Sequence, residues 1–185
     1  MNKITNTAEV KEKIVSEKEI KQFIIEKFRS VKKTKNIKNL IHFQATNKYM
    51  IMAHNQEELK ILGRIVASHK KISLNEIFRE YETHLKIALE TIPSVKTHTN
   101  VIMHIYGYFS KNLNEHERIN FIDVLQRFRK EENTIGETLN EISNIIFQLN
   151  NIYLASQTYF LLYSNSQFNL FFELFNNLES HAGEI

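Results

Sequence analysis

Apolar residues recur along this chain at spacings of three and four, which is the period of a helix with one buried face. At four points a Ser or Asn stands three residues before a Glu at the head of such a run, the spacing of a helix-capping box. The pairs are Ser16 with Glu19, Asn55 with Glu58, Ser73 with Glu76, and Asn114 with Glu117. This pattern predicts an all-α protein.

The apolar period divides the chain into eight predicted helices. Only 4 Gly and 1 Pro occur in 185 residues, which leaves too little turn chemistry for a sandwich or barrel of many hairpins. We therefore expect a single compact multi-helix domain with a basic N-terminal helix. The predicted helices cover residues 8–33, 37–53, 56–70, 74–91, 94–112, 115–132, 136–149 and 166–179.

Charge is distributed unevenly along the chain. Residues 1–38 hold 11 Lys or Arg against 5 Glu, whereas residues 141–185 hold 4 Glu and no Lys or Arg. We divide the chain into a basic N-terminal helical extension at 1–36, a helical domain at 37–163 and a Phe-rich C-terminal helix at 164–185. A basic helix attracts phosphates, but a Lys-rich helix that also contains Glu is typical of a solvated surface.

The C-terminal helix is predicted from one apolar stripe. The stripe either packs on the core or forms a homo-oligomer interface, and no Lys or Arg flanks it to meet anionic lipid. Its members are Phe168, Phe171, Phe172, Phe175 and Leu178.

Composition excludes several kinds of chemistry. With no Cys, the chain has no thiolate nucleophile and no thiolate metal or iron–sulfur site of its own. Its eight His show no metal-binding spacing, so we expect no metal and no cofactor. No apolar run reaches the roughly 20 residues of a membrane span, and the N-terminus has no leader-like apolar region, which predicts a cytoplasmic protein without membrane attachment.

One predicted helix carries a polar stripe inside an apolar run. Residues 101–109 are apolar on nearly every helical face, which predicts a buried central helix. Asn100, His104 and Tyr108 lie four residues apart on this helix, and Gly107 beside them leaves room for close approach. The stripe is either the floor of a ligand pocket or an internal hydrogen-bond network. His98 shares an apolar face and is interpreted as a core histidine.

Three further residues are candidate ligand contacts. Lys48 lies on an apolar stripe of the predicted helix 37–53, where its ammonium group either snorkels to solvent or meets an anion. His54 follows at the end of that helix and suits either pairing with a helix C-terminus or catalysis. Arg64, on a polar helix face, is either a surface residue or a second phosphate contact.

Two sequence blocks point to a family. Residues 47–54, NKYMIMAH, with residues 62–67, LGRIVA, resemble the "HKYxLMAH…LGRLVA" block of the YbgA-like family of uncharacterised bacterial proteins. Residues 97–109, THTNVIMHIYGYF, are similar to its "THxNVLMHIMGYF" block, and residues 153–159 resemble its closing "YLxxQxYL" segment. The chain departs from the family at Asn47, where His is common.

The family resemblance implies a context but no established activity. Such domains are often fused behind a Cys-bearing desulfidase domain that acts on thiolated pyrimidines, which suggests a desulfidase-type partner protein here. This chain lacks two Pro-Leu pairs of the family and has Thr134-Ile135 and Thr138-Leu139 in their place. If those proline turns shape a binding loop in the family, the ligand of this chain differs or is absent.

Three functions are compatible with these observations. The first is a ligand-binding or accessory domain for a pyrimidine nucleotide or RNA. In this function Lys48 and Arg64 would contact phosphate, and the base would be bound by Asn100, His104 and Tyr108. The second is a small hydrolase or transferase that uses His54 or His104 as a base. The third is a helical oligomeric scaffold that binds a partner through the Phe stripe.

Overall fold

The computed structural model describes residues 15–148 and 151–164, and within these residues the chain forms helices and no strands. The all-α class predicted from the sequence is therefore confirmed. The predicted helix 166–179, with its Phe stripe, lies outside the described residues. The helices are α1 (Glu17–Thr34), α2 (Ile37–Thr46), α3 (Lys48–His54), α4 (Gln56–Ala67), α5 (Leu74–Glu90), α6 (Val95–Phe109), α7 (Glu115–Arg129), α8 (Ile135–Gln148), α9 (Ile152–Ala155) and α10 (Thr158–Tyr163).

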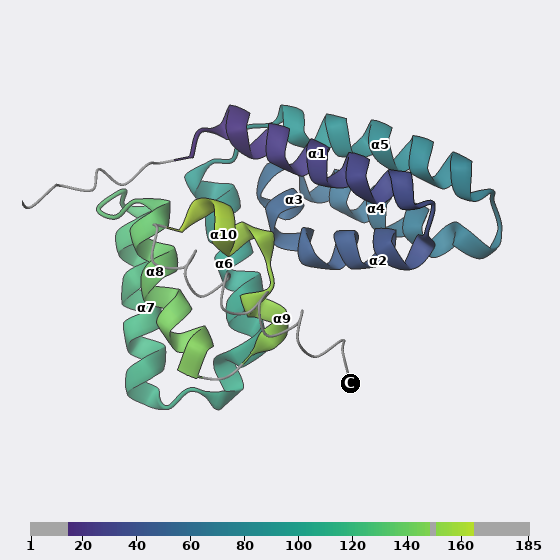
Figure 1. The fold of residues 1–185 in the computed structure, drawn as a ribbon. Helices are drawn as coiled ribbons and strands as arrows, with labels where there is room; N and C mark the ends of the chain where they lie inside the picture. Colours follow the sequence, from purple (N-terminus) through teal and green to yellow (C-terminus); the bar gives the residue numbers. More distant parts are fainter. Residues whose placement is uncertain (1–14, 149–150, 165–185) are drawn as a thin grey trace, which may run out of the picture.

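The helices form two groups that meet at α3 (Figure 1). In one group, α1 and α5 run side by side with α2 and α4 packed against them. In the other, α7 packs between α6 and α8, and their axes run across those of the first group. The short helix α3 contacts α4 and α5 on one side and α6 and α10 on the other. It therefore holds residues of both groups together.

The predicted caps occupy the helix starts. The Ser16–Glu19 and Asn114–Glu117 pairs form complete capping boxes at α1 and α7, while Asn55 and Ser73 cap α4 and α5 through their own side chains. Helix α6 also begins with a capping box, formed by Ser94 and Thr97. Local hydrogen bonding therefore sets most helix starts.

The predicted helix 37–53 is wrong in one respect, because Asn47 divides it into α2 and α3. The Asn47 side-chain amide donates a 2.8 Å hydrogen bond to the Phe43 carbonyl, and its backbone leaves the helical conformation at φ −102° and ψ 7°. The Asn47 backbone N–H donates to the same carbonyl at 3.0 Å, so the side chain adds a second bond at the end of α2. Helices α9 and α10 fall between the predicted helices 136–149 and 166–179, where no helix was expected.

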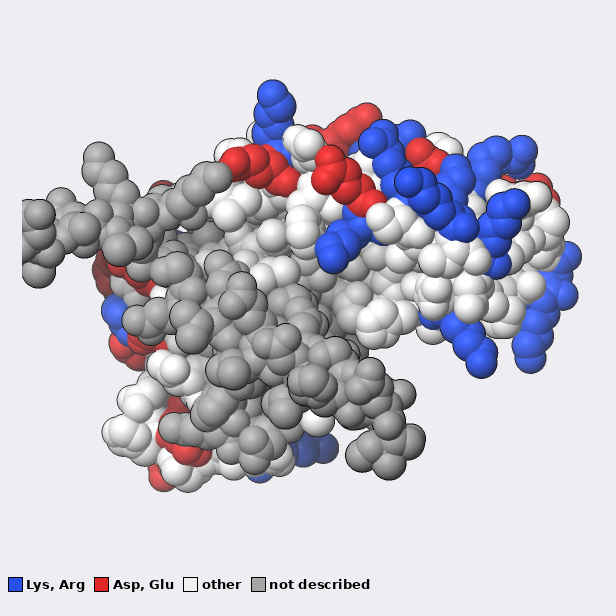
Figure 2. Space-filling model, viewed as in Figure 1, with Lys and Arg blue, Asp and Glu red and all other residues white. Residues whose placement is uncertain are grey.

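Helix α1 is part of the core along one face. Ile20, Ile24 and Phe28 are fully buried, and the Phe28 ring stacks on Tyr81 of α5 with 5.3 Å between centroids. The opposite face carries Lys and Arg, which gather over α1 and its junction with α2 in Figure 2. The basic helix is thus anchored by its apolar stripe and presents its charge to solvent.

Gly63 offers a test of local stability. A Cβ atom placed on Gly63, in the interior of α4, would meet no atom within 4 Å. Because a mid-helix Gly costs about 0.5–1 kcal/mol relative to Ala, Gly63→Ala should stabilise the protein by about that amount. Urea unfolding would measure the change, and a lower midpoint would contradict the open packing at this position.

Candidate functional site

A lysine and three tyrosines meet where α3, α6 and α9 come together. The Lys48 ammonium lies 5.4 Å from the ring centroid of Tyr49 and 5.8 Å from that of Tyr108. The Tyr49 and Tyr108 rings meet edge to face at 6.4 Å, and Tyr153 lies 5.5 Å from Tyr108. Among the described residues no carboxylate pairs with Lys48. We call these four residues the Lys–Tyr cluster.

Tyr49 is the buried member of the Lys–Tyr cluster. Its side chain is fully buried, and its hydroxyl, which makes no hydrogen bond of regular geometry to a described residue, neighbours the hydroxyl of Tyr108. Burial, together with the charges on Tyr108 and Tyr153, raises the pKa of the Tyr49 phenol well above its usual range. A neutral phenol is a hydrogen-bond donor, and the Tyr49 proton faces the Tyr108 oxygen, whose negative form it favours. The cluster therefore contains a buried donor beside the Tyr108 hydroxyl.

Tyr108 is the exposed member, with 49% of its surface open to solvent. Partial burial raises the pKa of its phenol, but the charge of Lys48 and the neighbouring Tyr153 lower it, and the net pKa lies below the ordinary value of 10.0. Burial and the charge on Tyr108 in turn raise the pKa of Tyr153 to about 12. The cluster thus favours negative charge on an oxygen beside Lys48.

The predicted burial of residues 101–109 on nearly every face is wrong. Ile102 and Ile105 are buried, but His104 and Gly107 are exposed and Met103 is 43% exposed. Helix α6 packs against α3 and α7 on two sides, which leaves its third side in water. An apolar composition cannot reveal which side that is, because much of any protein surface is apolar.

The polar stripe of α6 runs along this open side. Asn100 donates a 3.0 Å hydrogen bond to Gln56 at the start of α4, and Tyr108 meets Lys48 at the start of α3. These two ends are separated by eight residues, or about 12 Å of helix. His104 lies between them and makes no hydrogen bond to a described residue. We call Asn100, His104 and Tyr108 with the adjoining Lys48 the α6 face.

His54 lies inside the protein, with 1% of its surface exposed. Its Nδ1 is 2.6 Å from the Thr91 carbonyl oxygen, which can only accept, so Nδ1 carries the proton. Its Nε2 faces Glu17 at 3.7 Å, and the Tyr163 hydroxyl donates to the same carboxylate at 2.9 Å. Burial lowers the pKa of His54 although Thr91 and Glu17 oppose the shift, so the residue is neutral.

His98 is a core histidine, as the sequence indicated. It is 7% exposed, and its Nδ1 lies 2.8 Å from the Tyr159 hydroxyl. The Tyr163 ring lies edge-on at 4.9 Å, which connects His98 with the surroundings of His54. Burial, with a smaller contribution from His54, lowers the pKa of His98 to about 4.

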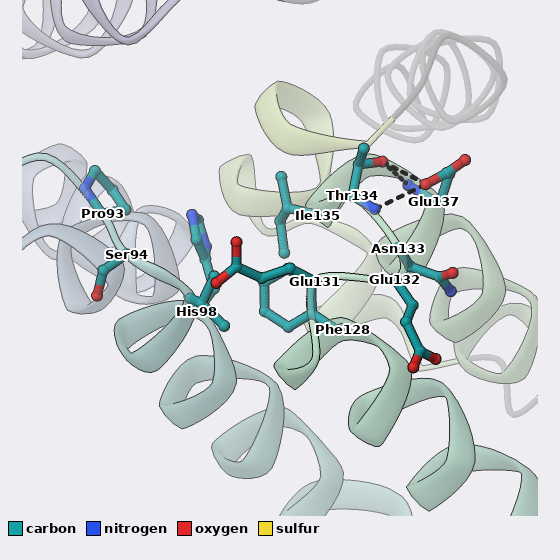
Figure 3. Close-up of a pocket in the computed structure, with 11 residues that line it drawn as sticks. Pro93, Ser94, His98, Phe128, Glu131, Glu132, Asn133, Thr134, Ile135 and Glu137 are labelled. Atoms are coloured by element: carbon teal, nitrogen blue, oxygen red, sulfur yellow. Dashed lines mark hydrogen bonds between the residues drawn. The ribbon is translucent and has the colours of Figure 1, made fainter.

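His98 also lines a cavity of about 410 Å³ between the start of α6 and the loop that joins α7 to α8 (Figure 3). Phe128 forms an apolar wall, while Glu131, Glu132 and Glu137 contribute carboxylates, and no Lys or Arg lines it among the described residues. The Glu137 carboxylate is engaged by the backbone and hydroxyl of Thr134. This acidic surface does not suit a phosphate group.

Arg64 is exposed in the last turn of α4. It lies eight residues, or about 12 Å along the helix axis, from Gln56, the α4 residue that contacts the α6 face. Of the six candidate residues, the structure brings Lys48 against Tyr108. Asn100 and His104 lie further along the same side of α6, whereas Arg64 and His54 lie elsewhere. No group of three or more potential metal-binding side chains occurs within the described part of the chain.

The sequence reading missed two members of the Lys–Tyr cluster. Tyr49 follows Lys48 directly, and helical geometry would point neighbouring side chains about 100° apart rather than toward one ligand. Tyr153 is 105 positions from Lys48 and falls in a segment that the helical pattern left unassigned. Its only signal was its place in the closing segment of the family resemblance.

The lowered pKa of Tyr108 is directly testable. In an alkaline absorbance titration, one tyrosine should ionise before the others, and Tyr108→Phe should remove that first phase. Lys48→Met should move the phase to higher pH, because the phenolate loses its neighbouring positive charge. Tyr106→Phe, a substitution on the same helix, should leave it in place. A first phase that survives in Tyr108→Phe would contradict this assignment.

The buried His98 predicts a loss of stability in acid. Its folded pKa of about 4 lies below the ordinary value of 6.5, so the unfolded chain binds a proton first as the pH falls. The neutral His98 contributes fully to the free energy of unfolding above pH 6.5. That free energy should fall by about 2 kcal/mol between about pH 7 and pH 5.

Urea unfolding at the two pH values would measure this loss. His98→Phe keeps a ring at this position but does not titrate, so it should lose about 2 kcal/mol less than wild type over the same interval. The control His116→Gln, at an exposed position, should retain the wild-type dependence. Equal losses in wild type and His98→Phe would contradict the buried neutral state.

Comparisons with known proteins identify the family of this chain. The chain is 27% identical over 125 residues to the "Uncharacterized protein YbgA" of Escherichia coli (strain K12), an alignment that covers 67% of this chain and 74% of that protein. No solved structure matches significantly. The family described as "Protein of unknown function (DUF1722)" matches residues 48–164, a segment that contains the whole Lys–Tyr cluster and the α6 face. Because this match covers more than half of the chain, the protein belongs to the DUF1722 family.

Proposed function

We propose that this protein is a helical binding module for a nucleotide or a short RNA segment, which it binds on the α6 face. The observation that carries the proposal is the position of the Lys48 ammonium, which lies over two phenol rings without a carboxylate partner among the described residues. A phosphate oxygen there would receive a charge-assisted hydrogen bond from Lys48. The Tyr49 hydroxyl, beside that of Tyr108, is a further donor nearby.

The rest of the α6 face suits a base. Tyr108 exposes half of its surface beside Lys48, and a base can stack on such a ring whatever its sequence. Asn100 and His104 add a side-chain amide and an imidazole on the same stripe. An open face of this kind fits a strand that runs across α6 as well as a single nucleotide. Thiolated pyrimidines are the bases that the family resemblance suggests first.

The wider role that we propose is accessory. The family resemblance associates such domains with a desulfidase domain, and this chain has no Cys with which to perform desulfuration. In this role the α6 face would hold a thiolated nucleotide or RNA for a desulfidase-type partner protein. The basic surface over α1 would add long-range attraction for RNA (Figure 2).

Burial argues for binding over His-dependent hydrolysis. His54 is 1% exposed and engaged with Thr91, so a substrate cannot reach it without opening the core. His104 is accessible, but no described carboxylate hydrogen-bonds to it and orients it as a general base. The part of the chain that the structure describes contains no helix with the length and apolar character of a membrane span.

Lys48→Met tests the proposed phosphate contact. Loss of a charge-assisted hydrogen bond should weaken binding of uridine monophosphate or its thiolated analogue by roughly 10- to 100-fold in calorimetry. The fold should change by less than about 1 kcal/mol, because Met keeps the chain length and packs favourably on aromatic rings. Lys70→Met removes the same charge at a distant exposed position and should bind like wild type.

The salt dependence of the affinity distinguishes an RNA ligand from a mononucleotide. Affinity for a short oligouridylate should fall steeply with salt, in proportion to the number of phosphates contacted, whereas a mononucleotide should show a shallow dependence. If neither ligand stabilises the wild-type protein, or if Lys48→Met and Lys70→Met bind equally, the α6 face is not a nucleotide site.

A further inference from the structure

The oxygen of Tyr108 is surrounded by hydrogen-bond donors on the open side of α6. The Lys48 ammonium and the hydroxyls of Tyr49 and Tyr153 all adjoin it. Partial burial disfavours the ionised phenol, whereas each of these neighbours favours it. Tyr49 is fully buried, so the core holds its hydroxyl in place, while 49% of the Tyr108 surface meets solvent. A phenolate at Tyr108 is therefore stabilised from within and remains accessible to a ligand.

His104 lies one turn before Tyr108 on the same face of α6. The two side chains are four residues apart, so their Cβ atoms are about 5–6 Å from each other. His104 is exposed, and so is Gly107, where a Cβ atom would meet no atom within 4 Å. The Lys48 ammonium lies on the other side of the Tyr108 ring tip from the core. A phosphodiester can therefore lie across this turn of α6 beside Lys48.

The spacing of His104 and Tyr108 suits displacement at a phosphorus atom that lies between them. The entering and leaving oxygens are on opposite sides of phosphorus, so a base and an acid must act on opposite sides. RNA supplies its own entering oxygen, because a 2′-hydroxyl adjoins each internal phosphate. Tyr108 suits the base, since donors surround its oxygen, whereas no described carboxylate orients His104 for that role.

We propose that the α6 face cleaves RNA by transesterification, with Tyr108 as the base, His104 as the acid and Lys48 on the phosphate. This inference rests on the RNA binding proposed above. The Tyr108 phenolate takes the proton of the 2′-hydroxyl, and the 2′-oxygen forms a bond to phosphorus while the bond from phosphorus to the 5′-oxygen breaks. The His104 imidazolium gives its proton to that 5′-oxygen.

The products are a 2′,3′-cyclic phosphate and a 5′-hydroxyl. Tyr108 then holds one proton more than at the start and His104 one fewer, so proton exchange with water restores both residues. Lys48 neutralises the charge that develops on the phosphate oxygens which are neither entering nor leaving. The step needs no further reactant.

The dinucleotide UpU reports this activity directly. Wild-type protein should release uridine 2′,3′-cyclic phosphate and uridine, which chromatography separates. Tyr108→Phe should slow this release by at least about 100-fold, and Lys48→Met by about 100- to 1,000-fold. Lys70→Met and Tyr106→Phe are the matched controls and should cleave like wild type. A contaminating nuclease would act equally in all these preparations, and thermal melts confirm that each variant is folded.

An activated leaving group assigns the two proton-transfer roles. In uridine 3′-(4-nitrophenyl phosphate) the leaving nitrophenolate needs no acid. His104→Gln should therefore slow cleavage of UpU by at least about 100-fold but cleave this ester within about threefold of the wild-type rate. Tyr108→Phe should remain slow on both substrates. The opposite pattern, with Tyr108→Phe rescued by the ester and His104→Gln slow on both, would overturn the assignment of the base.

Binding without cleavage distinguishes this inference from the proposed function. An oligouridylate with 2′-O-methyl groups keeps the phosphates but lacks the attacking hydroxyl, so it should bind wild type and resist cleavage. If Lys48→Met weakens binding of this analogue but wild type cleaves no RNA, the α6 face is a binding site and the inference is wrong. Equal cleavage of UpU by wild type and Tyr108→Phe is equally contrary to it. If the analogue does not bind at all, the proposed function fails as well.

Discussion

The fold depends on a neutral histidine buried where the two groups of helices meet. His54 ends α3, and its Nδ1–H donates to the Thr91 carbonyl in the link between α5 and α6. On its other side Tyr163 of α10 donates to Glu17 of α1, close to Nε2. Four separate segments thus converge on one imidazole. Charging that ring would place a cation in the core, which is why burial holds its pKa low.

This anchor positions the opposite end of α3. Lys48 lies six residues before His54, or about 9 Å along the axis, and rests against Tyr108 at the C-terminal end of α6. The buried end of α3 is neutral and engaged with protein groups. The opposite end carries a partly exposed cation whose described neighbours are phenols rather than carboxylates. The same seven-residue helix therefore joins a structural site to a candidate binding site.

Asn47 explains why α3 exists as a separate helix. Its side-chain amide and its backbone N–H both donate to the Phe43 carbonyl at the end of α2, and Lys48 follows at the first position of α3. The Asn47 Oδ1 atom is itself buried without a hydrogen-bond partner among the described residues. Asn47 thus marks the break after which Lys48 begins α3 and reaches the α6 face. The acidic cavity beside His98 lies apart from that face and has the opposite charge.

Local sequence determined the helical class and most helix starts, because a capping side chain bonds within three residues of itself, as Asn114 does with Glu117. It also placed Asn100, His104 and Tyr108 on one stripe, since helical period is a local property. The apolar face of His98 also indicated its burial, but tertiary packing alone decided that His104 is exposed, because the run around it is apolar on nearly every face. It also brought Tyr153 to Tyr108, since contacts between distant segments depend on which helix faces meet rather than on any local pattern.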